Sequence, residues 1–353
     1  MKRLRVLHLD SGRSWRGGQR QALLLSLGLR ARGHEPFLIG SPESPLVQRA
    51  RAAGLAVAAI PMLADWDIRA ARQIRARMRT WSVDLVHAHD ARSHALAMIA
   101  LIGRRDIPLI VTRRVPFPPR SVRLKYGERV TRFIAISNAV RDAMVAGGID
   151  PSRITVVHSG IAARTERVTP RDWRVELGWP VDSVICGVVG AMTAEKGIDS
   201  LSAIVAALPE IARRKARLVL IGGGTDHSDF SGLPTHSAGF LTDIDPAIAG
   251  LDVLWHPSRA EGLGTSVIDA MSLGVPPVAF AVGGIPEVIE QGISGLLVPA
   301  GDAVAFASSA ASLIQHSDLR ARLANGASAR AKTFDAAEMT KGTETVYEQV
   351  LSG

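Results

Sequence analysis

Short apolar runs alternate with amphipathic stretches along the chain, and this alternation restricts the fold more than any other feature of the sequence. Helical patterns such as 19–31, 68–79, 93–102 and 200–208 lie between the runs. Repeated β–α alternation predicts parallel sheets with helices on both faces. The runs expected to form strands are 5–9, 36–39, 56–60, 85–87, 109–112, 133–136, 155–157, 184–189, 218–221, 253–256, 277–280 and 295–298.

So many strands in one open sheet would be unusual, and 353 residues suffice for two hydrophobic cores. We therefore predict an α/β protein of two facing Rossmann-like domains with a deep cleft between them, because open α/β sheets bind ligands at the carboxyl ends of their strands. Proline and glycine interrupt the pattern within 162–179. The expected division is an N-terminal domain at 1–165, a C-terminal domain at 166–335, and a helix at 336–353 that packs back on the N-terminal domain.

The composition is that of an ordinary globular protein, with 47% hydrophobic and 21% charged residues. A single cysteine, Cys186, cannot form an intramolecular disulfide, which favours a reducing cytoplasmic location. Asp10 interrupts the apolar N-terminal run, so we interpret this run as a strand and not as a signal peptide. The longest apolar run, 95–102, is far shorter than the roughly 20 residues that span a bilayer.

The net charge of +9 is unevenly distributed. Residues 1–165 carry 28 Lys/Arg and 11 Asp/Glu, whereas residues 166–353 carry 14 and 22. This asymmetry indicates that the first half meets an anionic partner, such as a phospholipid surface, a phosphorylated glycolipid or nucleic acid. The alternative is an arginine-rich set of solvated helix faces. Nucleic acid is the poorest partner, because no known binding module and few aromatic platforms are present.

The stretch EGLGTSVIDAM follows an expected strand and opens an expected helix. Glycines permit a tight turn there, and free amides at a helix start can bind an anion. Glu261 and Asp269 would repel a phosphate but can accept hydrogen bonds from hydroxyls on either side of a diphosphate. For Asp269 alone, stabilisation by the helix dipole is the alternative.

In its longer context this stretch becomes EGLGTSVIDAMSLGVPPVAFAVGGIPEVIEQGISGLLVP, and it resembles the retaining nucleotide-sugar glycosyltransferases with the two-Rossmann GT-B fold, the family four group. The segments GGQRQALLLSLGLRARGHE, VDLVHAHDARSHALA, FIAISNAVRD, VGAMTAEKGID and LVLIGGG follow in that family's order. Many motifs in one order are a stronger signal than a single glycine pair.

The resemblance implies a role for each matching position. Glu261 would contact hydroxyls of the transferred sugar, and Lys196 would neutralise the diphosphate. His89 would face the transferred sugar, and Asp269 would hold the ribose. The glycine loop at Gly17 and Gly18 would approach the diphosphate. The donor-binding amides would be those of Gly262, Leu263, Gly264 and Thr265.

The chain departs from the family pattern in three places. Ala191 stands where relatives have an arginine, so Lys196 is the only basic residue that this motif offers the diphosphate. Asp269 is one methylene shorter than the usual glutamate. Residues 225–238 are short where relatives have a full helix.

For several polar residues near expected strand ends, the sequence allows both a structural and a functional role. His87 and His89 could form a metal pair, but no third ligand is evident in the sequence, so no metal is expected and His87 is interpreted as a buried core histidine. Asp90 either orients a substrate hydroxyl or caps the following helix. His158 either lines the site or forms a plain turn.

The segment 111–132 combines seven basic residues with apolar ones. As an interfacial segment it would place Arg and Lys on anionic headgroups while the apolar residues dip into the membrane. A solvated loop and helix is the alternative. The residues expected on this acceptor and membrane side are Arg113, Arg114, Arg120, Arg123 and Lys125.

The resemblance predicts a cytoplasmic, metal-independent enzyme without a cofactor, peripheral to the inner face of the membrane. It would move a sugar from a nucleotide-diphosphate donor to a glycan or glycolipid hydroxyl with retention of configuration, in bacterial surface polysaccharide or lipopolysaccharide core synthesis. A sugar-nucleotide 2-epimerase and a non-catalytic glycan-binding relative are the alternatives. A nicotinamide-dependent enzyme is disfavoured because residues 10–18 do not match G-x-G-x-x-G.

Overall fold

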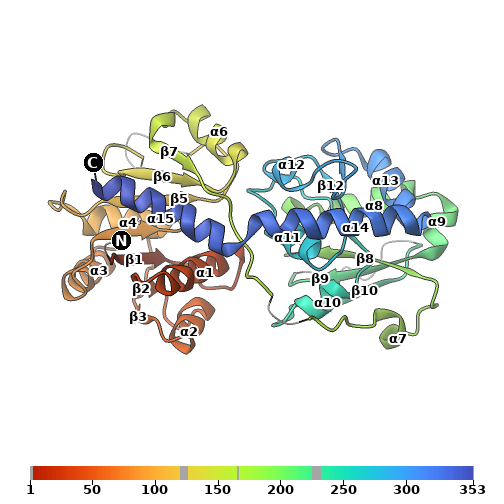
Figure 1. The fold of residues 1–353 in the computed structure, drawn as a ribbon, viewed down its shortest axis with the longest axis horizontal. Coiled ribbons are helices and arrows are strands. Elements are labelled where there is room, and N and C mark those ends of the chain that lie inside the picture. The colour runs from red at the N-terminus through yellow and green to blue at the C-terminus, as the bar shows by residue number, and fades with distance from the viewer. Residues whose placement is uncertain (1–2, 120–125, 165–166, 225–231, 353) are drawn as a thin grey trace. The chain divides into compact units, whose positions relative to one another are not determined.

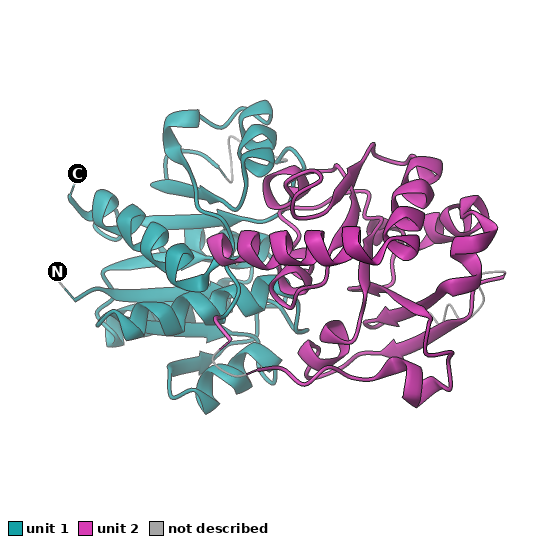
Figure 2. Cartoon of the chain, turned by 45° about the vertical axis from the view of Figure 1, so that its right-hand side comes forward, with its two compact units in different colours: residues 1–162, 335–353 teal, residues 163–334 magenta. Residues whose placement is uncertain are grey.

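The computed structural model describes residues 3–119, 126–164, 167–224 and 232–352. It divides the chain into two compact units (Figure 2). Unit 1 consists of residues 1–162 and 335–353, and unit 2 consists of residues 163–334. The final helix is therefore part of unit 1, although unit 2 separates it from the rest of that unit in the sequence.

Unit 1 contains a parallel sheet of seven strands in the order β3-β2-β1-β4-β5-β6-β7 (Figure 1). This order is Rossmann-like, because the chain reverses direction across the sheet between β1 and β4. The strands are β1 (Arg5–Asp10), β2 (Glu35–Gly40), β3 (Ala56–Ala59), β4 (Leu85–Ala88), β5 (Leu109–Arg113), β6 (Arg132–Ala135) and β7 (Ile154–Val156). The helices are α1 (Gly17–Ala31), α2 (Pro45–Ala52), α3 (Ile68–Thr80), α4 (Ala91–Ala100), α6 (Asn138–Ala146) and α15 (Ala336–Ser352), with a short 3-10 turn at Pro151–Arg153.

Helix α15 completes the core of unit 1. Its side chains Met339, Val346 and Tyr347 are buried in one cluster with residues of β1, β4, β5 and β6. It packs against α1, and an added Cβ at Gly28 would lie 2.2 Å from Thr340 Oγ1, so only glycine permits this approach. The buried Glu344 carboxylate pairs with Arg32 and His34, at 2.6 Å each, and fixes the helix further.

Unit 2 contains a second parallel sheet, of six strands in the order β10-β9-β8-β11-β12-β13. Trp255, Phe280 and Phe306 lie in its core. The strands are β8 (Val184–Val189), β9 (Ala216–Ile221), β10 (Thr235–Gly239), β11 (Val253–His256), β12 (Pro277–Phe280) and β13 (Leu296–Val298). The helices are α7 (Trp173–Leu177), α8 (Leu201–Ala207), α9 (Glu210–Lys215), α10 (Asp245–Ala249), α11 (Thr265–Ser272), α12 (Ile285–Val288), α13 (Ala303–Gln315) and α14 (Ser317–Ala331), with 3-10 turns at Ala194–Lys196, Ile198–Ser200 and Lys332–Phe334.

The two parallel sheets confirm the predicted α/β architecture, with one strand added. Strand β10 pairs with β9 and begins within the stretch 225–238, for which no strand was expected. Residues 225–231 of that stretch lie outside the described residues. Every residue of β10 is only partly buried, and its sequence THSAG has no apolar run. An edge strand of this kind carries no hydrophobic signature that sequence periodicity can detect. In the described part of the chain, no helix is long and apolar enough to cross a membrane.

Candidate functional site

Two loops of unit 2 bring Lys196 and Glu261 together. Lys196 ends the 3-10 turn after β8, and Glu261 lies in the loop between β11 and α11. The amide of Arg259 donates to the carbonyl of Glu195 at 2.9 Å, so the two loops are joined by their backbones. Gly197 has a φ of +74°, and an added Cβ would lie 1.8 Å from the carbonyl oxygen of Pro257, so glycine is required for this close approach.

The carboxylate of Glu261 is the centre of this cluster and is 8% exposed. Lys196 Nζ donates to Oε1 in an ion pair. Ser258 Oγ donates to the same oxygen at 3.0 Å, and His256 Nε2 lies 3.0 Å from it. Burial raises the pKa of Glu261, but His256 and Lys196 outweigh burial and lower the pKa to about 2. The carboxylate is therefore ionised at neutral pH and acts only as a hydrogen-bond acceptor.

The glycines after Glu261 lead into helix α11, whose N-cap is Gly264 in the left-handed conformation. No side chain caps this helix, so its first amides and its dipole favour an anion at this end. Leu263 is buried, and Gly262 and Thr265 stand on either side of the turn. The predicted donor residues Lys196, Glu261, Gly262, Leu263, Gly264 and Thr265 thus belong to one local structure.

Asp269 lies on α11 but does not present its carboxylate to solvent. It is 2% exposed, and Arg164 NH2 lies 3.6 Å from its Oδ1. The same guanidinium forms a bidentate pair with Asp245 at 2.7 and 2.9 Å. In the structure, the residue expected to hold a ribose is thus buried beside an arginine that the sequence analysis did not consider.

In unit 1, His89 follows β4 and lies in a cluster with His8 and His87. Arg114 NH2 lies 3.0 Å from His89 Nδ1, and His89 Nε2 lies 2.9 Å from His8 Nδ1. Because a guanidinium only donates, Nδ1 of His89 must accept, and the neutral ring carries its proton on Nε2, which donates to His8. Burial lowers the pKa of His8 to about 3 and that of His89 well below its ordinary value, so both rings are neutral.

His87 is held from two sides. Its Nδ1 lies 2.6 Å from the hydroxyl of Tyr347 on α15, and its Nε2 lies 2.7 Å from Thr112 Oγ1. This agrees with the interpretation of His87 as a buried, hydrogen-bonded core residue. His8 is a third imidazole that the sequence analysis missed, and the three rings offer nitrogens within 4.8 Å of one another.

These three histidines are a poor metal site as they stand. His8 and His89 share a hydrogen bond, both nitrogens of His87 contact hydroxyls, and the cationic Arg114 adjoins His89. Among the described residues, only Nε2 of His8 is left without a partner in the three rings. A cation would have to break these hydrogen bonds and tolerate the guanidinium, so we interpret the cluster as a neutral hydrogen-bonded network.

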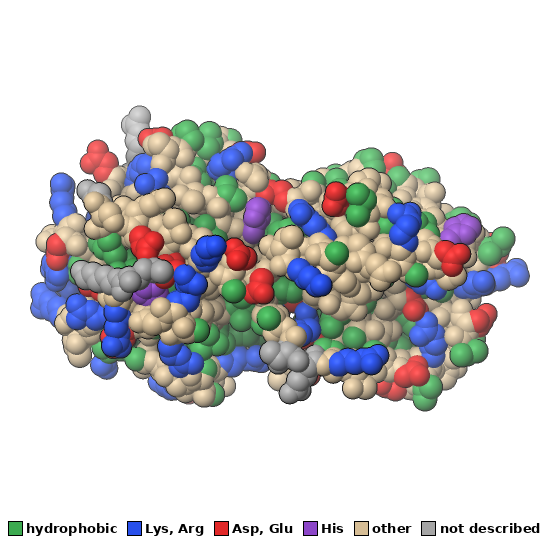
Figure 3. Space-filling view, in the orientation of Figure 1, with side chains coloured by type: hydrophobic (Ala, Val, Ile, Leu, Met, Phe, Trp, Pro, Cys, Tyr) green, Lys and Arg blue, Asp and Glu red, His purple; other side chains and the backbone are tan. Residues whose placement is uncertain are grey.

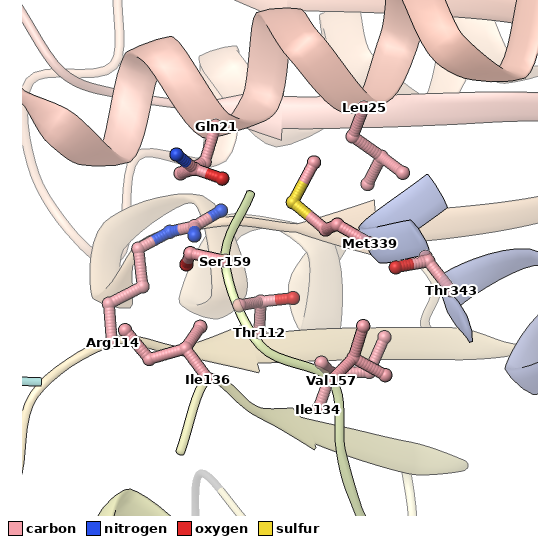
Figure 4. Close-up of a pocket in the computed structure, with 10 residues that line it drawn as sticks. All are labelled: Gln21, Leu25, Thr112, Arg114, Ile134, Ile136, Val157, Ser159, Met339 and Thr343. Atoms are coloured by element: carbon pink, nitrogen blue, oxygen red, sulfur yellow. The ribbon is translucent and has the colours of Figure 1, made fainter. Parts of the chain in front are cut away.

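Arg114 extends from the end of β5 over the N-terminus of α1. An added Cβ on Gly18 would lie 3.5 Å from its Cδ, whereas Gly17 is exposed. The guanidinium points towards Gln21 and Ser159 in a small cavity lined by residues of α1, β5, β6 and α15 (Figure 4). This cavity offers about 20 Å³ to the centre of a water molecule, which is room for a single water and too small for a sugar.

Asp10 is a buried carboxyl at the end of β1 that the sequence analysis used only to reject a signal peptide. Its Oδ1 accepts from the amide of Gly12 at 2.8 Å and from Gln19 Nε2 at 2.9 Å. Burial and then the neighbouring Asp90 raise its pKa to about 6, against these hydrogen bonds. Its place as the last residue of a strand is the signal that could have identified it, and the same holds for His256 on β11.

The remaining predicted residues lie as follows. Asp90 caps α4 through a capping box and accepts from the amide of Ser11 at 2.7 Å, so its role in the structure is that of a cap. His158 is half-buried in the irregular segment after β7, which leaves both of its interpretations open. Arg113 donates to the hydroxyl of Tyr126 at 2.9 Å. The predicted membrane residues Arg120, Arg123 and Lys125 lie outside the described residues.

Two family models match this chain, one in each half of the sequence. Residues 15–164 match the family described as Glycosyltransferase Family 4, and residues 183–316 match Glycosyl transferases group 1. A D-inositol 3-phosphate glycosyltransferase from Xylanimonas cellulosilytica is 30% identical over 75% of this chain and 72% of its own length. Against four other curated relatives, the chain spans 54% to 63% of their lengths.

Solved structures agree on the fold. The Anabaena protein HepE in complex with UDP-glucose has a TM-score of 0.84 and 21% identity, covering 98% of this chain and 100% of that one. WaaG, a glycosyltransferase involved in lipopolysaccharide biosynthesis, has a TM-score of 0.72 and 17% identity, covering 97% and 99%. The chain therefore belongs to the family four glycosyltransferases and has the α/β architecture of the GT-B fold.

Proposed function

We propose that this glycosyltransferase moves a sugar from a nucleotide-diphosphate donor to a hydroxyl of a glycan or glycolipid, with retention of configuration. The observation that carries the proposal is the cluster of Lys196, His256 and Glu261 beside the uncapped start of α11. An ionised acceptor for sugar hydroxyls and a cation for a diphosphate thus adjoin one helix N-terminus. The solved complex of HepE with UDP-glucose supports a donor of this class.

In the proposed reaction the bond from the sugar C1 to the β-phosphate oxygen breaks while C1 bonds to the acceptor oxygen on the same face. The acceptor's proton passes to the departing β-phosphate, and the products are the glycoside and the nucleoside diphosphate. Glu261 cannot supply a proton at neutral pH, because its pKa is about 2. Its role is to accept hydrogen bonds from the sugar, while Lys196 and the α11 amides stabilise charge that grows on the diphosphate.

The proposal includes no metal ion and no cofactor, because the diphosphate charge is assigned to Lys196 and the helix start. The proposed acceptor is a bacterial surface glycan or lipopolysaccharide core, and a contact with an anionic membrane on the cytoplasmic side accompanies it. The named role of WaaG supports this acceptor class, and so does the basic first half of the chain. The assignments of Gly17, Gly18, His89 and Asp269 to the donor remain predictions from the resemblance.

The test combines donor binding with product analysis. Thermal shifts across a panel of nucleotide sugars identify the donor, because a ligand that binds only the folded state stabilises it by mass action. Turnover of that donor is then followed with and without acceptor and with and without EDTA. We expect transfer or slow hydrolysis, undiminished by EDTA and abolished in Glu261→Gln, although that variant is still folded at the assay temperature.

Three outcomes would contradict the proposal. An epimerised donor without acceptor would indicate the epimerase, and tight donor binding without turnover would indicate a non-catalytic relative. A large loss of donor affinity in EDTA would overturn the metal-free mechanism.

A further inference from the structure

Helix α3 and the turn before it carry the most exposed group of large apolar side chains in the described part of unit 1. Leu63, Trp66 and Ile68 are 65%, 77% and 58% exposed, although they lie within six residues of sequence. Three arginines of the following helix, Arg69, Arg72 and Arg79, are exposed as well. We call these six residues the α3 face.

The turn that presents the apolar residues is anchored at both ends. Asp67 caps α3 by accepting from the amide of Ala70 at 3.0 Å, and Met62 is 1% exposed. Arg92 donates to the carbonyl of Met62 at 3.0 Å. The opposite side of α3 is buried through Ala70, Ala71, Ile74 and Met78. Because this side is packed, the α3 face cannot turn inward, and Trp66 stays in solvent.

The charge of the α3 face has one sign. Helix α3 contains five arginines and no acidic residue. At 100° per residue, Ile68, Arg79, Arg72 and Arg69 fall within a sector of about 100°. The nearby Asp65 lies 3.7 Å from Arg92, and Asp67 is the helix cap. Lys and Arg side chains gather at the left-hand edge of unit 1 in Figure 3, around the place of α3 in Figure 1.

A fourth exposed apolar residue, Ile102, adjoins the same helix. Arg75 donates to the carbonyl of Ile102 at 2.7 Å, and Ile102 is 66% exposed. Exposed apolar residues thus lie both at the N-terminal turn of α3 and beside Arg75, two turns further along the helix. Isolated exposed apolar residues need no explanation, but a group of them beside arginines is typical of an interaction surface.

We propose that the α3 face binds the surface of an anionic phospholipid bilayer. Trp66, Leu63 and Ile68 would enter the headgroup region, where the indole is favoured, and Arg69, Arg72 and Arg79 would contact lipid phosphates. A nucleic acid would use the arginines but would gain nothing from Leu63 and Ile68. The inference rests on the proposed function, because a membrane-borne acceptor would explain why the enzyme binds a bilayer. Vesicle binding itself can be measured without donor or acceptor.

This surface differs from the segment 111–132 that the sequence analysis considered. Arg113 and Arg114 of that segment make hydrogen bonds inside unit 1, to Tyr126 and His89. The arginines of the α3 face are exposed, and exposed apolar residues lie next to them in the sequence.

The test is co-sedimentation of the full chain with vesicles of phosphatidylcholine alone or mixed with phosphatidylglycerol. We expect binding only to the anionic vesicles, weakening as salt is added. Neutralising Arg69, Arg72 and Arg79 to Gln together removes about 1 kcal/mol per arginine, or roughly a hundredfold in partitioning. Quenching of tryptophan fluorescence by brominated lipid should fall in Trp66→Phe.

The matched control removes three exposed charges elsewhere, with Lys215, Lys332 and Lys341 changed to Gln. We expect its vesicle binding to change less than threefold. Equal binding to neutral and anionic vesicles would overturn the proposal, and so would a loss in the lysine control as large as in the arginine variant. Tighter binding of an oligonucleotide than of vesicles, lost in the arginine variant, would assign the surface to nucleic acid instead.

Donor turnover in vesicle-free buffer separates this inference from the proposed function. The arginine variant should turn over donor at the rate of the unmodified protein, because no residue of the α3 face belongs to the Lys196 and Glu261 cluster. Vesicle binding without any donor turnover would contradict the proposed function alone. Donor turnover without vesicle binding would contradict the α3 face alone.

Discussion

Asp10 in unit 1 and Glu261 in unit 2 are both buried carboxyls near the end of a strand, and their pKa values shift in opposite directions. Burial and Asp90 raise the pKa of Asp10 to about 6. Glu261 is buried too, but His256 and Lys196 lower its pKa to about 2. The difference lies in the partners: Glu261 contacts a cation directly, whereas Asp10 accepts from the neutral Gln19 and the amide of Gly12.

This contrast shows that two buried carboxyls beside parallel strands can have pKa values shifted in opposite directions, according to their neighbours. A carboxylate with a cation in contact stays ionised in a buried site, while one with a second carboxylate nearby tends to hold its proton. Arg114 lowers the pKa of Asp10 less than burial and Asp90 raise it, and its guanidinium contacts His89. Glu261 therefore keeps its negative charge well below pH 6, whereas Asp10 takes up a proton as the pH falls through about 6.

The largest expected effect comes from removing Lys196, the cation that contacts Glu261 in unit 2. Lys196→Ala should lower kcat by on the order of 10²–10³, because it removes a preorganised charge that stabilises the transition state. The donor Kd should rise less, since charge on the diphosphate grows as the sugar bond breaks. Steady-state kinetics and calorimetry measure the two quantities. Near-normal turnover would show that another residue holds the leaving group.

Ala191→Arg serves as the counterpart of this variant. It introduces the arginine that the family resemblance leads us to expect at this position, and should tighten the binding of donor and nucleoside diphosphate with little effect on kcat. A gain in kcat would mean that Lys196 alone is not sufficient for the chemical step.

The next effect tests the raised pKa of Asp10. A carboxyl whose pKa is about 6 when folded and near 3.8 when unfolded binds more protons in the folded state between these values. Its contribution therefore favours folding at low pH and is lost as the pH rises through 6, by roughly 2 kcal/mol between pH 4 and pH 7. In Asp10→Asn this part of the pH dependence should disappear, as followed by denaturant unfolding.

Glu261→Gln is the matched variant for this measurement. The pKa of Glu261 is lower in the folded state than in the unfolded state. Its ionised carboxylate therefore stabilises the fold above about pH 4.5, and this stabilisation is lost as the pH falls towards 2. Removing it should weaken folding above that pH, the opposite of the Asp10 effect. Parallel pH profiles for the two variants would contradict the comparison.

A moderate effect is expected at Arg164, which pairs with two carboxylates of unit 2. Arg164→Met leaves the buried Asp269 and the half-buried Asp245 without their cation, which should cost about 2 kcal/mol of stability. Asp245→Asn and Asp269→Asn distinguish structure from binding. If Asp269 holds the ribose, its variant weakens donor binding more than the Asp245 variant does. Equal donor affinities would give Asp269 a structural role.

The smallest effect concerns the neutral network of unit 1. Tyr347→Phe removes the hydroxyl that contacts His87, and we expect a loss of about 1 kcal/mol in stability. The nitrogen chemical shift of the His87 ring should change with it. In Tyr126→Phe, which alters the partner of Arg113, that shift should stay unchanged. An unaltered His87 signal in Tyr347→Phe would show that Tyr347 of α15 does not form a hydrogen bond with His87.

Much of the fold could be predicted because each core strand carries its own apolar run. The strands β8, β11 and β12 have the predicted bounds. Edge strand β10 escaped detection because its residues are half-buried and polar. The Lys196 and Glu261 motifs could also be found, since both are local strings of residues with a recognisable spacing. Ser258 and His256 were missed, although they stand within five residues of Glu261, because no pattern showed that their side chains turn towards it.

The sequence alone determined the α/β class, the parallel sheets, the family and the local loop around Glu261, because these depend on periodicity and short motifs. Only the tertiary structure decided which charges meet. Arg164 reaches Asp269 from more than a hundred residues away, Arg114 sets the tautomer of His89, and Tyr347 reaches His87 from the far end of the chain. Ionisation depends on burial and on neighbours within a few ångströms, and folding brings such neighbours together from distant parts of the sequence.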